Sequence, residues 1–248
     1  MRSDSFSPKI FADTAFSHAS TSERIVSVQV GELGLDLGCI GGAVSYWLPP
    51  GWSGLWAYRS GVLSCKGGER SSEAPAVNLV KLQVFMDRAA DAVETGGGAD
   101  FVTLAVPAED LACAQALERW YVTQCMTGSV ACRQFSSWLR QSERYQVVSF
   151  LLREESLSSK LCELAGRYGV SISHFRRLCH QALGCTAKTE LREWRTARAL
   201  LAKSRKETLT DLALTFGFSS PSHFSKEIRE LLGVSPSSLN DITRLSSR

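Results

Sequence analysis

One pattern occurs twice in the C-terminal part of the chain: a short amphipathic helix, a glycine-containing turn, and a second helix with a basic outward side. The first copy reads LCELAGRYGVSISHFRRLCHQAL over residues 161–183, and the second reads LTDLALTFGFSSPSHFSKEIRELLGVSP over residues 209–236. This order is typical of a helix-turn-helix unit, in which the second helix enters the major groove of DNA while the first braces it. Two copies in one chain therefore predict two adjacent major-groove contacts.

The residues around each turn predict where the helices end and begin. A glycine, Gly169 in the first copy and Gly217 in the second, is placed to end the first helix in a left-handed conformation. Side chains able to cap the second helix follow each glycine, and Pro221 suits a first helical turn. The candidate caps are Ser171 or Ser173 in the first copy and Ser219 or Ser220 in the second.

Apolar residues at three- and four-residue spacing predict the buried face of each helix. Between the two copies, residues 187–203 read as one continuous helix of roughly 25 Å. This helix would hold the two second helices about one DNA turn apart, near ~34 Å centre to centre. The expected core residues are Leu161, Leu164, Ala165, Phe175, Leu178, Cys179, Ala182, Leu191, Trp194, Ala197, Leu201, Leu209, Leu212, Ala213, Phe216, Phe224, Ile228, Leu231 and Leu232.

The charge of the chain is divided unevenly along its length. Residues 156–248 contain 15 Lys and Arg and 8 Asp and Glu, whereas residues 1–155 contain 13 basic and 17 acidic residues. A basic C-terminal part suits contact with phosphates, in binding that weakens steeply as the salt concentration rises. We therefore expect a flexible arm over residues 1–24, a regulatory or oligomerisation domain over 25–153, and a DNA-binding domain over 154–248.

The tandem units, the bridging helix and the closing GVSPSSL resemble the DNA-binding domain of the AraC/XylS family of bacterial transcription regulators. Within that family, RYGVSISHFRRLCHQALGCTAKTELREWRTARALL and GFSSPSHFSKEIRELLGVSPSSLNDI are closest to the activators of invasion-associated type III secretion genes, the InvF and MxiE kind. The resemblance begins near residues 142–152 and covers about the last hundred residues. The family often has an arginine where Lys226 lies and an aromatic residue where Ile228 lies.

The resemblance implies which residues meet DNA. Those carried over to base-contact positions are Ser173, Arg176, Arg177, Ser222, His223 and Lys226. Because arginine suits bidentate contact with guanine, and serine and histidine make more permissive contacts, we expect the first unit to supply most of the sequence discrimination. We expect phosphate contacts at Arg195, Arg198, Arg229 and Ser219. An exposed arginine is usually a solvated charge, and internal salt bridges are the alternative role for the last three arginines.

The N-terminal part has a β-like pattern. Short segments rich in valine, leucine and aromatic residues are separated by Gly, Pro and Ser clusters between residues 24 and 106. We expect an α+β chain whose β-rich domain is a cupin-like half-barrel, although residues 77–90 also read as a helix. Two helices, over residues 108–126 and 130–153, follow. They either pack against their own domain or form a dimer interface. The expected strand segments are IVSVQV, LGLDLGCI, AVSYWL, LWAYRSGVL, VNLVKLQVFM and FVTLAV.

The sequence leaves two alternatives for the signal that regulates the first domain. Trp47, Trp52, Trp56 and Tyr58 either line an apolar pocket for a small molecule or belong to the core. The resemblance implies instead that a tetratricopeptide-repeat chaperone of secretion substrates co-activates the chain. The expected function is a transcription activator of type III secretion and virulence genes, with promoter DNA and RNA polymerase as further partners. A small-molecule-gated metabolic regulator of the same family is the alternative.

We expect neither enzymatic activity nor a cofactor. The eight cysteines contain no C-x-x-C and no Cys/His spacing of a zinc site, which also argues against a DNA-repair methyl acceptor with metal-held cysteines. They fit a reduced, bacterial cytoplasmic protein, with a redox switch as the alternative. The GGGAD at residues 96–100 lacks the Lys-Ser/Thr of a phosphate loop. We find no signal-peptide pattern and no apolar run of about 18 residues that would predict a membrane span.

Overall fold

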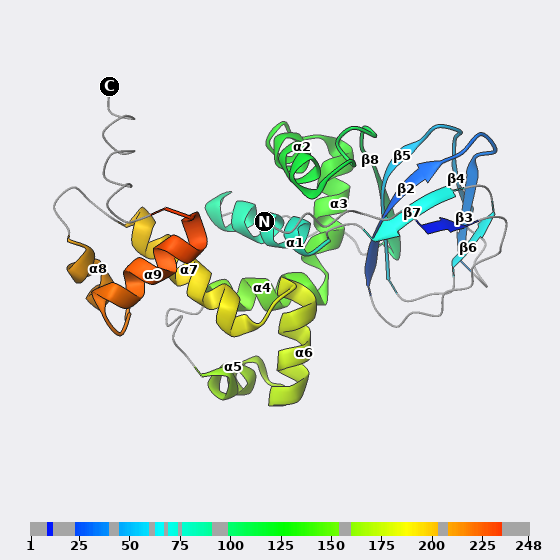
Figure 1. Cartoon of the computed structure of the whole chain (residues 1–248). Helices are drawn as coiled ribbons and strands as arrows, with labels where there is room; N and C mark the ends of the chain where they lie inside the picture. The colour runs from blue at the N-terminus through cyan, green and yellow to red at the C-terminus, as the bar shows by residue number, and fades with distance from the viewer. Residues whose placement is uncertain are drawn as a thin grey trace, which may run out of the picture. The chain divides into compact units, whose positions relative to one another are not determined.

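The computed structural model describes residues 9–11, 23–39, 45–59, 63–66, 69–73, 76–90, 99–153, 160–202 and 208–234 (Figure 1). The chain forms two compact units, Met1–Val148 and Ser149–Arg248. The division falls inside helix α4 (Glu143–Arg153). Most of the predicted N-terminal arm and the closing GVSPSSL beyond residue 234 lie outside the described residues.

Two antiparallel sheets form the β part of the first unit. The larger sheet has the order β1 (Lys9–Phe11), β7 (Glu69–Glu73), β2 (Arg24–Val30), β5 (Ser53–Tyr58) and β8 (Phe101–Ala105). The smaller sheet has the order β4 (Ser45–Leu48), β3 (Leu35–Cys39) and β6 (Leu63–Lys66). The central strands β2 and β5 pair with Val26 opposite Trp56 and Val28 opposite Gly54.

One apolar cluster joins the two sheets. It combines residues of β2 and β5 with residues of β3 and β4, so the inward faces of both sheets bury their side chains together. The rings of Trp56 and Tyr58 lie 4.7 Å apart within it, whereas Trp47 is 56% exposed. Two of the four aromatic residues singled out in the sequence are therefore core residues. The buried members are Val28, Val30, Leu35, Leu37, Leu48, Trp56 and Tyr58.

Helices of the same unit pack against the larger sheet. Helix α3 (Val130–Arg140) packs against β8, and α1 (Ala76–Ala90) packs against both α3 and α2 (Ala114–Met126) (Figure 1). Phe135, Trp138 and Leu139 of α3 are buried, as are Leu117 and Tyr121 of α2. These helices bury their apolar faces within their own unit, which is the first of the two roles considered for them.

The structure corrects several sequence-based boundaries in this unit. Residues 76–90 form a helix and not a strand, because Leu79, Val80 and Val84 fall at helical spacing on one buried face. The helix expected over 130–153 is two helices, since Ser142 begins α4 by accepting a hydrogen bond from the Tyr145 amide at 3.1 Å. The helix expected from residue 108 begins at 114, and the segment LWAYRSGVL ends one strand and begins another.

Two strands lie outside the segments expected from the sequence. Strand β7, with the polar sequence ERSSE, pairs with β2, and β1 pairs with β7 within the stretch expected to be a flexible arm. Both elements are strands because their backbones pair with a neighbouring strand. Neither sequence shows the alternation of apolar and polar residues that predicts a half-buried strand. The sheets match an α+β chain with a β-rich first part, while the cupin-like closure of that part stays a prediction.

The second unit consists of the end of α4 and five further helices among the residues described. These are α5 (Leu161–Tyr168), α6 (Ile172–Leu183), α7 (Ala187–Leu201), α8 (Leu209–Thr215) and α9 (Pro221–Leu232). Helix α5 packs on α6, α8 packs on α9, and α7 contacts both α6 and α9 (Figure 1). Helix α7 is thus the connector between two helical pairs, as the sequence predicts.

Each helical pair has its own core. Phe175 of α6 meets Tyr168 of α5 with ring centroids 5.4 Å apart, and Phe150 of α4 lies 5.0 Å from Tyr168. In the second pair, Phe218 and Phe224 lie 4.5 Å apart. The buried cluster of the second pair is Ala199, Leu212, Ala213, Phe218, Phe224 and Ile228.

Several expected core residues are not buried in these cores. Leu201 is 87% exposed and Leu232 is 46% exposed, whereas Leu161, Ala197 and Leu231 are only partly buried. Ala199 takes the buried place near the end of α7 that the spacing gave to Leu201.

Candidate nucleic-acid interface

Helices α6 and α9 each begin at a serine cap. The Ser171 hydroxyl accepts the His174 amide at 3.3 Å, and the Ser220 hydroxyl accepts the His223 amide at 3.0 Å. Pro221 occupies the first turn of α9, where its missing N–H leaves no bond unmade. Of the alternatives in the sequence, Ser171 and Ser220 are therefore the caps. Ser173 and Ser219 are exposed beside them.

The turn before each of these caps contains a glycine in the left-handed backbone conformation. Gly169 has φ of +84° and Gly217 has φ of +69°, which a residue with a Cβ adopts only at a cost. The start of α8 has a further cap that the sequence analysis missed. Thr208 accepts the Asp211 amide at 3.1 Å, and Asp211 accepts the Thr208 amide at 3.1 Å. Hydrogen bonds from Thr208 hold the pKa of Asp211 below its usual value.

The outward side of α6 carries the predicted base-contact residues of the first unit. Arg176 and Arg177 are exposed, and one terminal nitrogen of Arg177 lies 2.9 Å from Nδ1 of His174, one turn earlier. The hydroxyl of Ser173 lies 3.3 Å from that of the cap, Ser171. The structure therefore gathers Ser173, Arg176 and Arg177 near the start of one capped helix.

The outward side of α9 carries the corresponding residues of the second unit. Ser222, His223 and Lys226 are exposed. Nε2 of His223 lies 3.5 Å from the Glu227 carboxylate, and the Lys226 ammonium lies 3.8 Å from the Glu230 carboxylate, each one turn away. Both partners of the Lys226–Glu230 pair are exposed, so this pair contributes little to stability and is screened by salt. The Lys226 side chain is therefore able to turn toward a nucleic acid.

A groove of about 770 Å³ separates the two helical pairs. Arg176 of α6 lines one side, His223 of α9 lines the other, and residues of α7 lie between them. Among its described lining residues, five are Lys or Arg and Glu227 is acidic. A phosphate entering this groove would meet a net positive charge. The cationic lining residues are Lys160, Arg176, Lys188, Arg192 and Arg195.

A buried carboxylate fixes α9 against α7. Glu227 is only 5% exposed, and its carboxylate lies 3.0 Å from Nε of Arg192 on α7. Arg192 also lies 3.5 Å from the Glu230 carboxylate. The sequence does not mark Glu227 as buried, because a glutamate on an amphipathic helix is usually a solvated charge. Its position one turn after His223 and next to the core residue Ile228 was the available signal.

The predicted phosphate contacts fall into two groups. The Arg195 guanidinium lies over the Phe218 ring at 4.6 Å, and Arg198 donates to the Leu152 carbonyl at 3.2 Å. These two arginines have partners inside the unit, although neither contact is the internal salt bridge considered as the alternative role. Arg229 and Ser219 are exposed on α9 and in the turn before it. Their roles at phosphates stay predictions.

Two absences hold for the described part of the chain. Within it, no group of three or more His, Cys, Asp and Glu side chains could hold a metal ion. None of its helices is both long enough and apolar enough to cross a membrane.

Comparison with known proteins agrees with this geometry. Residues 164–241 match the family described as a helix-turn-helix domain, and this domain is of the AraC type. The C-terminal unit therefore contains the stretch that matches a helix-turn-helix domain.

The chain is a relative of two named proteins. It is 46% identical over 132 residues to the invasion protein InvF of Salmonella typhi, covering 53% of this chain and 61% of InvF. It is 40% identical over 110 residues to the transcriptional regulator MxiE of Shigella flexneri, covering 43% of this chain and 52% of MxiE. The chain thus spans about half to three-fifths of the length of these relatives.

A solved structure of ToxT from Vibrio cholerae also aligns with the chain. The alignment covers 94% of this chain and 93% of ToxT, with 13% identity and a TM-score of 0.37. A likeness at this level supports no argument about function.

Proposed function

We propose that this protein is a sequence-specific transcription activator that reads promoter DNA through α6 and α9. The observation that carries the proposal is the pair of serine-capped helices whose exposed basic side chains border one cationic groove. A recognition helix that begins at a cap presents its N-terminal residues to base edges. The positive helix terminus also favours nearby phosphate.

The two helices differ in what they offer to bases. Helix α6 presents Arg176 and Arg177, either of which can make bidentate bonds to guanine, while α9 presents His223 and Lys226 with carboxylates one turn away. We therefore assign most of the sequence discrimination to α6. Helix α9 supplies a second, more permissive contact in the adjacent major groove.

The target genes are those of type III secretion and virulence. Support comes from the relatives, one named an invasion protein and the other a transcriptional regulator, which match 132 and 110 residues of this chain. The proposal includes co-activation by a tetratricopeptide-repeat secretion chaperone, contact with RNA polymerase, and action in the bacterial cytoplasm. Pairing of two chains through the first unit belongs to the same proposal.

A reporter assay in a host that lacks secretion genes tests this function. The full chain is expressed alone, and then together with a secretion chaperone from the same gene cluster, beside a secretion promoter. Activation only with both proteins is expected. Full activation by the chain alone would contradict chaperone control, and no activation in either case would contradict the assignment of an activator.

Matched variants separate DNA reading from the regulatory signal. Arg176→Ala together with Arg177→Ala should abolish activation while leaving the chaperone bound to the chain in a pull-down. Arg119→Ala, on exposed surface of α2 in the other unit, is the control and should activate normally.

The small-molecule alternative predicts that a ligand raises the melting temperature of the chain. It also predicts activation that does not change when the chaperone is added.

A further inference from the structure

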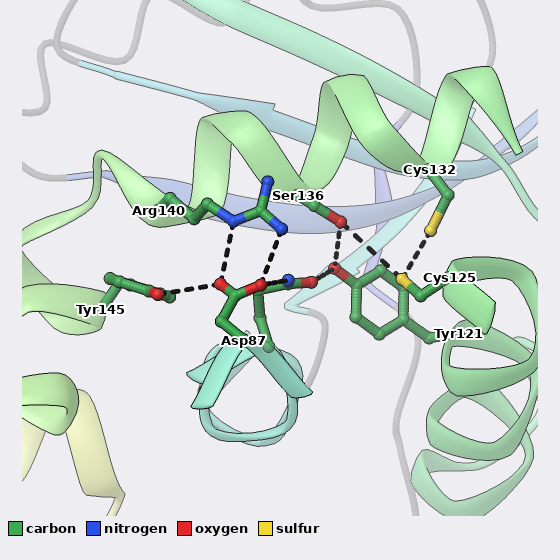
Figure 2. A network of polar contacts seen from close by, with 8 residues as sticks. Asp87, Tyr121, Cys125, Cys132, Ser136, Arg140 and Tyr145 are labelled. Atoms are coloured by element: carbon green, nitrogen blue, oxygen red, sulfur yellow. Dashed lines mark hydrogen bonds and ion pairs between the residues drawn. The ribbon is translucent and has the colours of Figure 1, made fainter. Parts of the chain in front are cut away.

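Two cysteine thiols meet where α2 turns into α3. Cys125 lies in the last turn of α2, Cys132 lies in the first turn of α3, and their Sγ atoms are 2.8 Å apart (Figure 2). Both cysteines are free. A disulfide bond has a length of about 2.05 Å, so the two sulfurs need to approach by less than about 1 Å to be joined. The helical hairpin therefore places two reduced thiols almost at bonding distance.

The turn between them holds this geometry. The Gly128 amide donates to the Cys125 carbonyl at 3.2 Å, and Gly128 has φ of +73°. The Ser129 amide donates to the Gln124 carbonyl at 3.3 Å, and the Thr127 amide donates to the Thr123 carbonyl at 3.0 Å. These local bonds link the end of α2 to the start of α3. The turn between the two helices therefore positions the two thiols next to each other.

The two thiols differ in access and in acidity. Cys132 is 1% exposed, whereas Cys125 is only partly buried. A hydrogen bond from the Cys132 thiol lowers the pKa of Cys125 to about 7, with a further contribution from Ser136 and the charge of Arg140. The same hydrogen bond, with burial, raises the pKa of Cys132. Near neutral pH the accessible sulfur therefore carries a substantial thiolate fraction, and the shielded sulfur keeps its proton.

Polar groups from all four neighbouring helices surround the pair. The Ser136 hydroxyl lies 3.7 Å from Sγ of Cys125 and 3.0 Å from the Tyr121 hydroxyl, which donates to Gln83 at 2.7 Å. Beyond them, the Asp87 carboxylate accepts bonds from Gln83 and Arg140 and from Tyr145 of α4 (Figure 2). Burial raises the pKa of Tyr121, so this phenol stays neutral. Arg140 is therefore the charged group in this network that favours a thiolate.

We propose that Cys125 and Cys132 form a peroxide-reactive pair that closes reversibly to an intramolecular disulfide. Cys125 is the attacking thiol, because it is the accessible one, and Cys132 is the resolving thiol, because its sulfur is in contact with Cys125 and shielded from solvent. The oxidant is a hydroperoxide. This modification site lies in the first unit, whereas the proposed base-contact residues lie in the second.

The chemistry balances in two steps. The Cys125 thiolate attacks one oxygen of hydrogen peroxide, the O–O bond breaks, and sulfenic acid and hydroxide result. The Cys132 sulfur then attacks the Cys125 sulfur, the S–O bond breaks, and the hydroxyl leaves as water with the Cys132 proton. The two sulfurs together lose two electrons, which reduce the peroxide. A dithiol reductant reverses the closure.

Mass spectrometry of the full chain tests this proposal. The reduced protein is treated briefly with hydrogen peroxide near pH 7.5, its remaining thiols are alkylated under denaturing conditions, and it is cut with trypsin. One tryptic peptide, WYVTQCMTGSVACR over residues 120–133, contains both cysteines. We expect this peptide without alkyl groups and two hydrogens lighter than its reduced form. A dithiol added before alkylation should restore two alkylation sites.

Cys113 and Cys162 provide internal controls, because both are exposed. They should remain alkylated at peroxide concentrations that close the pair. Oxidation of Met126, which is 81% exposed in the same peptide, adds one oxygen and is distinguished by its mass. The proposal is overturned if peptide 120–133 takes up two alkyl groups while Cys113 or Cys162 is oxidised, or if Cys125 instead joins two chains.

Variants test the order of the two steps. Cys132→Ser should stop Cys125 at sulfenic acid, which dimedone traps. Cys125→Ser should leave Cys132 fully alkylatable after the same peroxide treatment. Oxidation of Cys132 in the Cys125→Ser chain would overturn the assigned roles. If either variant fails to fold, the result on the unmodified chain decides the proposal.

Discussion

Neutralising Glu227 should loosen α9 from α7. Glu227 is 5% exposed and pairs with Arg192 at 3.0 Å and with His223 at 3.5 Å. Glu227→Gln keeps the size of the side chain and removes its charge. Glu230→Gln is a matched control, because Glu230 also pairs with Arg192, at 3.5 Å, but its side chain is 45% exposed.

The expected loss of stability follows from how exposed the two partners of Glu227 are. Removing one partner of a fully buried ion pair costs about 3–5 kcal/mol, whereas an exposed pair contributes about 0–1 kcal/mol. The Arg192 side chain is 39% exposed and keeps Glu230 as a second partner, which places Glu227→Gln between these limits. We expect a loss of about 1–2 kcal/mol for Glu227→Gln. Glu230→Gln should lose no more than about 0.5 kcal/mol.

Hydrogen exchange of the full chain measures this loss locally. A loss of about 1–2 kcal/mol corresponds to amide exchange in α9 that is roughly 5- to 30-fold faster, since 1.36 kcal/mol is a factor of ten. Exchange in β2 and β5 of the other unit should not change. The reasoning is refuted if Glu227→Gln and Glu230→Gln accelerate exchange in α9 equally.

Three further outcomes are expected. Ser171→Ala and Ser220→Ala should each destabilise the second unit by about 1 kcal/mol in urea unfolding, whereas the exposed, non-capping Ser222→Ala should not. Arg177→Ala should weaken binding to a selected DNA site by about 1–3 kcal/mol and relax specificity at one base pair. An equal loss on all DNA sequences would make Arg177 a phosphate contact. The alkylation rate of Cys125 should rise through a midpoint near pH 7, because its thiolate forms above its pKa of about 7. A midpoint near the ordinary thiol value of ~8.5 would contradict the role of the Cys132 hydrogen bond.

The elements that could be predicted from the sequence are those with local signals. The glycines at 169 and 217 and the proline at 221 mark helix ends through backbone conformation, which depends on few distant contacts. The choice between Ser219 and Ser220 as the cap needed the structure. The two serines are adjacent in the sequence. Which hydroxyl accepts a hydrogen bond from the first amides of α9 depends on the residue at which that helix begins.

The elements that were missed depend on contacts between distant residues. Strand β7 exists because β2 offers it a partner, and its sequence ERSSE carries no apolar alternation. Residues 76–90 fit both a buried strand and a helix until packing decides. The 87% exposure of Leu201 differs from the burial that helical periodicity predicts for it.

The candidate DNA surface was predicted in part. The exposed positions on α6 and α9 follow from helical periodicity, because they lie off the apolar face. The buried role of Glu227 and the stacking of Arg195 on Phe218 could not be predicted, since each depends on how α7 packs against α9 and the turn before it. The meeting of Cys125 and Cys132 likewise depends on the angle of a helical turn and not on their spacing.

A guanine-methylation protection footprint of the full chain tests the central claim most directly. The DNA is a fragment enriched from random sequence by repeated binding to the protein. We predict two protected major-groove patches on one face of the duplex, about one turn or 10 base pairs apart, one for α6 and one for α9. A single patch, or contacts confined to phosphates without protected guanines, would contradict reading by two recognition helices.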